Sequence, residues 1–285
     1  MQSLPADAYE VIVTDDSRDE TVQNLVANEF PAVRWVQGPR RGPAANRNSG
    51  ARLCRAEWIV FTDDDCIPDK NWLSAFAAAI ESSGADLLEG RTLCLDRTNA
   101  LTEETIENPN GGNFWSCNLA VRSTTFESLR GFDEDFVEPA QEDSEFAARV
   151  RAAGYKTIFV RDAVVNHPAR RLGLRKLWER SLKIRWFSLY LLKTRPGWAQ
   201  RSAGTALCLV FFERAANLLR ENWSLARNWK ANGFTRTAFL MIWKALTFPI
   251  LLPYVLWWEL KFRRSISVPN RSACPQNPEA AFSLR

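Results

Sequence analysis

Three consecutive aspartates, Asp63, Asp64 and Asp65, follow the apolar segment 58–61 and have the chemistry of a metal site. Like charges this close repel one another, and a protein core cannot hold them unpaired. A strand that carries them at its carboxyl end is therefore expected to form a site for a divalent cation. Carboxylate oxygens suit hard ions such as Mg²⁺ or Mn²⁺, which often carry a phosphorylated ligand. The alternative for an isolated acidic triplet is a solvated surface turn.

The elements around this triplet have the pattern of an α/β domain. Asp15 and Asp16 follow the β-branched segment 11–14, and a helix start containing Arg47 precedes the second strand. In open α/β sheets, ligands bind beyond the carboxyl ends of the strands. Both acidic clusters are therefore predicted to lie at the ligand-binding edge of a sheet.

Charge divides the chain sharply. Residues 1–145 hold 12 Lys/Arg against 27 Asp/Glu, whereas residues 146–285 hold 25 against 6. A chain of 285 residues has room for one large domain and an appendage. The division indicates an acidic catalytic half joined to a basic half that faces an anionic partner.

The six cysteines show no regular spacing and no secretory signal precedes the first strand, so a reducing cytosolic setting with free thiols is expected. A zinc site is disfavoured because the chain has one histidine. Residues 265–285 are rich in proline and are predicted to be disordered.

Further along the acidic half, turn residues and apolar patterns predict the remaining elements of the domain. We expect a helix at 71–81, a strand near 86–90 and a loop at 108–112. A helix is expected to open at Gln141 and to stop at Gly154, followed by separate strands at 157–160 and 163–168.

These residues resemble family 2 glycosyltransferases of the GT-A fold over roughly residues 9–170. The motifs occur in order: Asp-Asp-Ser after a strand, Arg-Asn-x-Gly, Asp-x-Asp, Asn-x-Ala-x-Arg, Gly-Phe-Asp-Glu, Glu-Asp at a helix start, and a histidine after a strand. The resemblance implies a Rossmann-like nucleotide-diphospho-sugar transferase domain, with a mixed sheet flanked by helices. It implies an enzyme of the hexosyltransferase kind.

The resemblance makes Asp63 and Asp65 the Asp-x-Asp pair, with Asp64 as the variable residue between them on the donor side. Asp65 would be the direct ligand of Mn²⁺ or Mg²⁺, with Asp63 beside it, and the metal would bridge the diphosphate of a nucleotide-sugar. A metal at that position stabilises the negative charge that the departing nucleoside diphosphate gains. His167 would complete the metal or diphosphate site; the alternative for a lone histidine is a structural role.

The resemblance also assigns residues to the donor. Asp15 or Asp16 would hydrogen-bond the base, which in relatives is often uracil, so a UDP-sugar is the expected donor. Arg47 would lie near the base or the phosphates, where its fixed charge complements them.

Asp143 is the candidate general base, which would take the proton from the acceptor hydroxyl as it attacks the anomeric carbon with inversion. The alternative is that Glu142 and Asp143 merely favour the positive end of their helix. Trp115, Asn118 and Glu142 are assigned to the acceptor side, with core packing as the alternative for Trp115.

The chain departs from the family at its beginning. The family normally starts with a central strand, a loop and a helix before the strand that corresponds to residues 11–14, and here eight residues precede Tyr9. The first strand and helix of the domain are therefore expected to be missing. Either the true start codon lies further upstream, which we favour, or the gene is a fragment with impaired donor binding.

The basic half has the composition of a membrane-associated region. Residues 170–201 hold ten Lys/Arg and one acidic residue, interleaved with aromatic side chains, which suits an interfacial helix on anionic lipid. Such a surface would also suit nucleic acid, but no nucleic-acid motif accompanies it.

Residues 237–258 carry one charge, Lys244, and are just long enough to span a bilayer. Two prolines and a Trp pair within them argue against a span, and segment 206–212 could form a packed hairpin with them; a soluble helical cap is the alternative.

The chain is thus predicted to comprise a GT-A domain (1–170), a basic helical membrane-associated region (171–264) and a tail (265–285). The leading hypothesis is an inverting, metal-dependent, single-addition glycosyltransferase at the cytoplasmic face of the cell membrane, acting on a glycan or lipid-linked acceptor. A processive enzyme is disfavoured, because Leu182 stands where the Gln-x-x-Arg-Trp motif of processive synthases has glutamine. The alternatives are a degenerate membrane-associated sugar or nucleotide binder and a nucleotidyltransferase.

Overall fold

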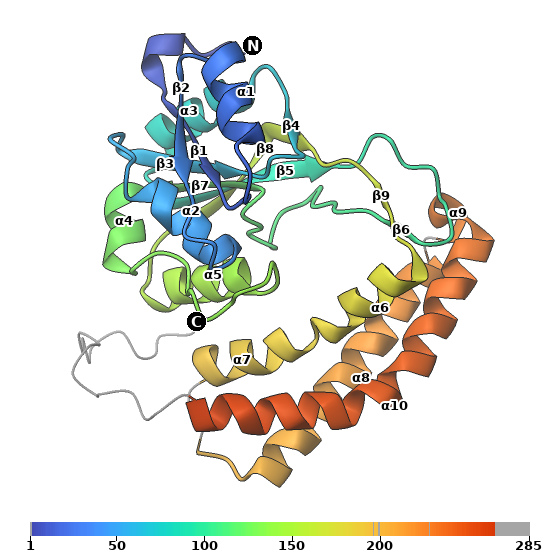
Figure 1. The fold of residues 1–285 in the computed structure, drawn as a ribbon. Helices are drawn as coiled ribbons and strands as arrows, with labels where there is room; N and C mark the ends of the chain where they lie inside the picture. Colours follow the sequence, from blue (N-terminus) through green and yellow to red (C-terminus); the bar gives the residue numbers. More distant parts are fainter. Residues whose placement is uncertain (1, 196, 199, 228, 266–285) are drawn as a thin grey trace.

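The computed structural model describes residues 2–195, 197–198, 200–227 and 229–265, and it combines an α/β domain with a layer of long helices (Figure 1). The strands are β1 (Val11–Asp15), β2 (Val33–Gln37), β3 (Trp58–Thr62), β4 (Ile67–Pro68), β5 (Leu87–Leu93), β6 (Glu103–Glu104), β7 (Asn118–Arg122), β8 (Thr157–Asn166) and β9 (Arg170–Arg171). The α-helices are α1 (Thr21–Glu29), α2 (Pro43–Ala51), α3 (Trp72–Ser83), α4 (Ser123–Ser128), α5 (Glu142–Ala152), α6 (Leu174–Leu182), α7 (Arg185–Thr194), α8 (Ala203–Arg227), α9 (Trp229–Asn232) and α10 (Phe234–Ser265).

The main sheet is mixed, as predicted. Its strand order is β3-β7-β5-β8-β4; β7 runs antiparallel to both of its neighbours, whereas β5 and β8 are parallel. β1 and β2 form a separate parallel pair. In the described part of the chain, the β1–β2 pair is not hydrogen-bonded to the five-stranded sheet.

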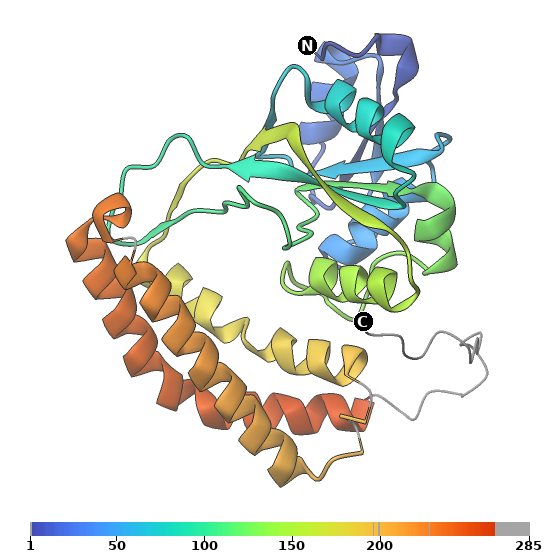
Figure 2. The same ribbon diagram turned by 180° about the vertical axis from the view of Figure 1, so that it is seen from behind.

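Helices cover both faces of the main sheet (Figure 2). The central strand β5 shows why: Leu87 and Leu88 point to opposite faces, and both are fully buried. Leu87 packs with residues of α2, α4 and α5 on one face, and Leu88 packs with α3 on the other. The α/β class is therefore confirmed. The hydrophobic clusters on the two faces of the sheet hold the strands, and with them the residues at their carboxyl ends, in position.

Most predicted elements of the second half of the domain are found. α3 and α5 lie where helices were expected at 71–81 and from Gln141 onward. The prediction of separate strands at 157–160 and 163–168 was wrong, because β8 is continuous from Thr157 to Asn166. Both of its halves pair with β5, and an irregularity between Gly90 and Arg91 of β5 absorbs the interruption.

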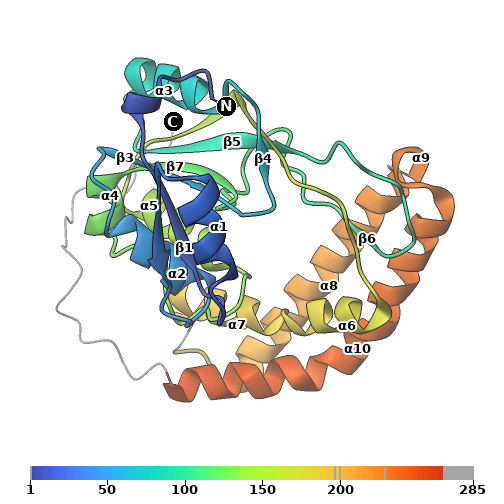
Figure 3. The same cartoon turned by 45° about the horizontal axis from the view of Figure 1, so that its top comes forward.

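The carboxyl-terminal region is a stack of helices (Figure 3). α7 packs against α10 through a cluster that includes Trp186, Leu189, Val255 and Phe262. α8 lies against α10, with the rings of Phe211 and Phe248 5.5 Å apart. The apolar segment 237–258 lies within α10, and the tail predicted beyond it, residues 266–285, lies outside the described residues.

Gly90 gives a test of this packing. A Cβ at Gly90 would lie 2.2 Å from Oδ1 of the buried Asn118 side chain. We expect Gly90→Ala to lower the free energy of unfolding by about 3 kcal/mol, because the core must move to accept the methyl group. Gly204→Ala is the control, since a Cβ there meets nothing within 4 Å. Thermal unfolding of both variants measures the difference, and equal melting temperatures would contradict this packing.

Candidate active site

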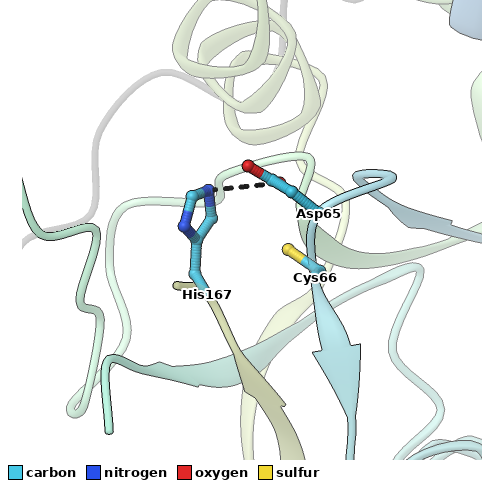
Figure 4. Close-up of side chains that lie close together, drawn as sticks. All are labelled: Asp65, Cys66 and His167. Carbon is cyan, nitrogen blue, oxygen red and sulfur yellow. Dashed lines mark ion pairs between the residues drawn. The ribbon is translucent and has the colours of Figure 1, made fainter. Parts of the chain in front are cut away.

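Strand register brings Asp65 and His167 together from positions about 100 residues apart. β4 pairs antiparallel with the end of β8, and Ile67 stands opposite Asn166, so the residues before β4 meet the residue after β8. Asp65 Oδ1 lies 3.6 Å from His167 Nε2 (Figure 4). The thiol of Cys66 joins them, and ligand atoms of the three residues lie within 4.8 Å of one another. Cys66 was missed by the sequence analysis, although it directly follows the triplet.

The atoms that face each other in this cluster fit a divalent cation. Asp65 Oδ1 and His167 Nε2 are buried and have no hydrogen-bond partner. His167 Nδ1 lies 3.1 Å from the carbonyl oxygen of Pro168; a proton on Nδ1 donates to that oxygen and leaves the Nε2 lone pair facing Asp65. Buried unpaired polar atoms are costly, and one cation between them would satisfy both.

Arg170 is the second residue that sequence reasoning missed as part of the site. Its Nε donates to Asp65 Oδ2 at 3.1 Å, and its Nη2 donates to the same oxygen. Arg170 is the last residue of the predicted GT-A domain and was considered only as one of the basic residues of segment 170–201. Its place in the sequence could have identified it, because Arg170 follows the candidate ligand His167 by three residues. In the structure it lies in β9, which pairs with β6.

Asp63 lies in a different cluster from Asp65. Its Oδ1 accepts a hydrogen bond of 2.7 Å from Arg47 Nη2, and Arg47 Nη1 donates to Glu142 Oε1 at 3.0 Å. Arg47 therefore joins the end of β3 to the start of α5. Asp63 forms an ion pair with the Arg47 guanidinium and is not among the residues grouped around the candidate metal position, Asp65, Cys66 and His167. Asp64 is exposed between the two clusters.

Asp143 stands in the first turn of α5, next to Glu142. Its Oδ1 accepts from Ser144 N at 2.7 Å and its Oδ2 accepts from Ser116 N at 3.4 Å. Burial, helped by the negative charge of Glu142, raises the pKa of Asp143 to about 7 against the opposing charge of Arg47. A carboxylate with a pKa near neutrality suits proton transfer at physiological pH.

Asp15 and Asp16 both lie at the carboxyl end of β1, but they make different contacts. Asp15 is buried and accepts hydrogen bonds from Ser17 N, Ser17 Oγ and Trp35 Nε1 at 2.8, 2.8 and 3.2 Å. Burial opposes its ionisation, but these hydrogen bonds outweigh burial and lower the pKa of Asp15. Asp16 is less buried and accepts one hydrogen bond of 2.8 Å from Arg40 N. Of the two, Asp16 has more capacity left for a ligand.

The geometry separates the two predicted acceptor residues on the 115–118 segment. Asn118 is 1% exposed, and its Oδ1 accepts from Trp72 Nε1 at 2.8 Å. Its Nδ2 donates to the carbonyl oxygens of Arg91 and Ala163 at 3.1 and 3.0 Å. These bonds occupy the amide within the core, so the assignment of Asn118 to the acceptor is corrected to a structural role. Trp115 is half-buried and stays a candidate.

Comparison with known sequences finds similarity to glycosyltransferases. Residues 1–130 match the family model described as Glycosyl transferase family 2. The chain is 28% identical over 190 residues to glycosyltransferase AglE of Haloferax volcanii, with 60% of each chain covered. It is 37% identical over 57 residues to an uncharacterized glycosyltransferase of Haemophilus influenzae, covering 20% of this chain and 19% of that one. The chain thus spans less than two thirds of the length of either relative.

Solved structures show the same fold. The S. aureus TarS fragment 1–349, in complex with UDP, superposes with a TM-score of 0.52 at 16% identity, over 93% of this chain and 82% of that one. The mannosyltransferase PcManGT from Pyrobaculum calidifontis, in complex with GDP-Man and Mn²⁺, superposes with a TM-score of 0.52 at 20% identity, over 93% and 81%. The fold is that of the GT-A-like glycosyltransferase structures, and the match to the glycosyl transferase family 2 model covers the first 130 residues of this chain.

Proposed function

We propose that this chain is an inverting, metal-dependent glycosyltransferase that moves a sugar from a nucleotide-sugar to a hydroxyl of a glycan or lipid-linked acceptor. The observation that carries the proposal is the buried, unpartnered pair of Asp65 Oδ1 and His167 Nε2, 3.6 Å apart at the ligand-binding edge of the sheet. The structural relatives that were solved with UDP, or with GDP-Man and Mn²⁺, support a nucleotide-sugar donor and a divalent metal.

Asp65 and His167 would hold Mn²⁺ or Mg²⁺, and Cys66 is within reach of the same ion. When bound, the ion supplies positive charge that stabilises the departing nucleoside diphosphate. Arg170 contributes a fixed positive charge on the other oxygen of Asp65. Asp16, at the end of β1, is the best placed of the two β1 aspartates to bind the base, and a UDP-sugar is the proposed donor.

Asp143 is the proposed general base. Its carboxylate would accept the proton of the acceptor hydroxyl while the hydroxyl oxygen forms its bond to the anomeric carbon and the bond to the diphosphate breaks on the opposite face. Glu142 and Arg47 tune this carboxyl from either side, because the charge of Glu142 raises its pKa and that of Arg47 lowers it. Trp115, on the segment whose Ser116 amide contacts Asp143, is the proposed acceptor platform.

We also propose that the reaction takes place at the cytoplasmic face of a membrane, with the basic helical region in contact with the lipid. Among the described residues, α10 is the one helix long and apolar enough to cross a bilayer, by length and composition. A membrane-bound acceptor would then reach the site from the side of α6 and α7.

The metal site is tested by replacing its ligands. We expect His167→Ala and Asp65→Ala to remove the Mn²⁺-dependent rise in melting temperature that UDP or GDP causes in the wild type, because binding to the folded state alone stabilises it. Transfer from a panel of UDP- and GDP-sugars should fall about 100-fold or more. Asp162→Ala is the control, since Asp162 is an exposed carboxylate on the same strand β8. Unchanged Mn²⁺ dependence in both ligand variants would remove the basis for the proposal.

The general base is tested by pH. Asp143 accepts a proton only when ionised, so kcat/KM of the wild type should rise as pH increases through about 7. Asp143→Asn should lower transfer about 10²- to 10⁴-fold while leaving UDP and Mn²⁺ binding intact. A pH profile that is flat from 6 to 8, or an Asn variant with wild-type turnover, would exclude Asp143 as the base.

The carboxyl group of Asp143 should also make the free energy of unfolding depend on pH, in a direction that its raised pKa determines. Its pKa is raised in the folded state, so the folded protein holds this proton more tightly, and ionising Asp143 costs stability as pH rises from about 4 to about 7. Asp143→Asn avoids that cost. We expect its advantage in melting temperature over the wild type to be absent near pH 4, to grow up to pH 7 and then to level off. A variant that is less stable than the wild type at pH 8 would contradict this account.

A further inference from the structure

Helix α10 is attached to the rest of the protein along its whole length. Near its start Arg236 Nη2 donates to the carbonyl oxygen of Glu103 at 2.7 Å, and in its middle Trp243 Nε1 donates to Ser181 Oγ at 3.2 Å. Near its end Glu259 accepts a hydrogen bond of 3.1 Å from Trp198 Nε1. These anchors span 23 residues, or about 35 Å of helix. The buried side chains on this face are Arg236, Thr237, Thr247, Leu251, Val255, Glu259 and Phe262.

The opposite side of α10 is apolar and uncovered. Ile242, Leu246, Ile250 and Trp257 are 55–64% exposed, and their spacing of four, four and seven residues puts them on one side of the helix. Large apolar side chains gathered in this way mark a surface that meets another apolar phase. We call these four residues the α10 stripe.

The neighbouring helix α8 carries exposed apolar side chains as well. Phe212, Leu219 and Trp223 are 67–73% exposed and recur at seven and four residues, which is the spacing of one helix side. Both long helices of this region therefore present apolar side chains to the outside, over a length of several turns.

Cationic side chains flank the α10 stripe. Lys261 is exposed, and its Nζ lies 5.0 Å from the ring centre of Trp257; Arg264 is exposed one turn further on. Beyond the other end, Lys230 lies 5.8 Å from the ring centre of Trp229. Tryptophan beside lysine or arginine, at the end of an apolar stripe, suits the boundary between acyl chains and anionic headgroups.

We propose that α10 docks flat on an anionic bilayer and does not cross it, with the α10 stripe inserted among the acyl chains and Lys230, Lys261 and Arg264 at the headgroups. A spanning α10 would have to break the anchors at Arg236, Trp243 and Glu259 and leave Trp243 Nε1 without an acceptor in the hydrocarbon. It would also lose the packing of Val255 and Phe262 against α7. The inference specifies the membrane contact of the proposed function, but it does not depend on the transfer chemistry.

Vesicle flotation tests the surface. The full chain should float with vesicles that contain phosphatidylglycerol and bind at least about tenfold more weakly to pure phosphatidylcholine. The double variant Leu246→Glu/Ile250→Glu should lose flotation about tenfold or more, because two charges would enter the acyl region. Leu25→Glu is the matched control: Leu25 is an exposed leucine on α1 of the α/β domain, and this variant should bind like the wild type. Equal flotation of the double variant and the wild type would overturn the proposal.

Two further measurements test the alternative explanations of the α10 stripe, which are a membrane span and an interface with a second copy of the chain. An epitope added after Arg285 should remain open to protease in sealed vesicles that carry the catalytic domain outside, whereas protection of the epitope would show that α10 spans. The purified chain should be monomeric, and a dimer that the double variant dissociates would show that a second copy covers the stripe. Mn²⁺-dependent stabilisation by UDP should persist in the double variant, so loss of docking is distinguishable from failure of the proposed chemistry.

Discussion

Mutual repulsion among four carboxylates is the constraint on which the rest of this site depends. Asp63 and Asp65 follow β3, Glu142 and Asp143 begin α5, and these four carboxyl groups are accommodated in three ways. Arg47 joins Asp63 to Glu142, and Arg170 pairs with Asp65. For Asp143, burial instead raises the pKa to about 7. Asp65 Oδ1 and the neighbouring His167 Nε2 are buried without a hydrogen-bond partner and lie 3.6 Å apart, so a further cation fits between them. In our proposal, this distribution of charge separates a metal-binding end of the site from a proton-accepting end.

Local sequence signals predicted most of the elements, and the family resemblance named several residues of the candidate site. Apolar segments ending in aspartates gave β1 and β3, and Asp65, His167 and Asp143 were each assigned from motifs that follow a strand or open a helix. These signals work because a strand end or a helix start fixes the direction of the next few side chains. The two buried faces of β5, with Leu87 and Leu88 on opposite sides, explain why the α/β class was readable from short apolar runs.

Contacts across the fold could not be predicted in the same way. Cys66 joins the cluster through the pairing of β4 with β8, and Arg170 through the pairing of β9 with β6. β4 and β9 are only two residues long, which is too short to show a periodic pattern in the sequence. Asn118 was assigned to the acceptor from the resemblance of its Asn-x-Ala-x-Arg segment, but in the structure its amide joins Trp72, Arg91 and Ala163 inside the core. In the helical layer, composition gave the apolar segment, but its anchored and exposed sides follow only from packing against α7 and α8.

The central claim is that Asp65 and His167 bind the divalent ion that carries the donor diphosphate. The most direct measurement is a crystal structure of the chain soaked with Mn²⁺ and UDP, with anomalous scattering collected to locate manganese. The account predicts an anomalous peak within coordination distance of Asp65 Oδ1, His167 Nε2 and the diphosphate oxygens, while Asp63 keeps its ion pair with Arg47. Manganese bound at Asp63 with His167 left uncoordinated, or UDP bound in full without manganese at either residue, would contradict it.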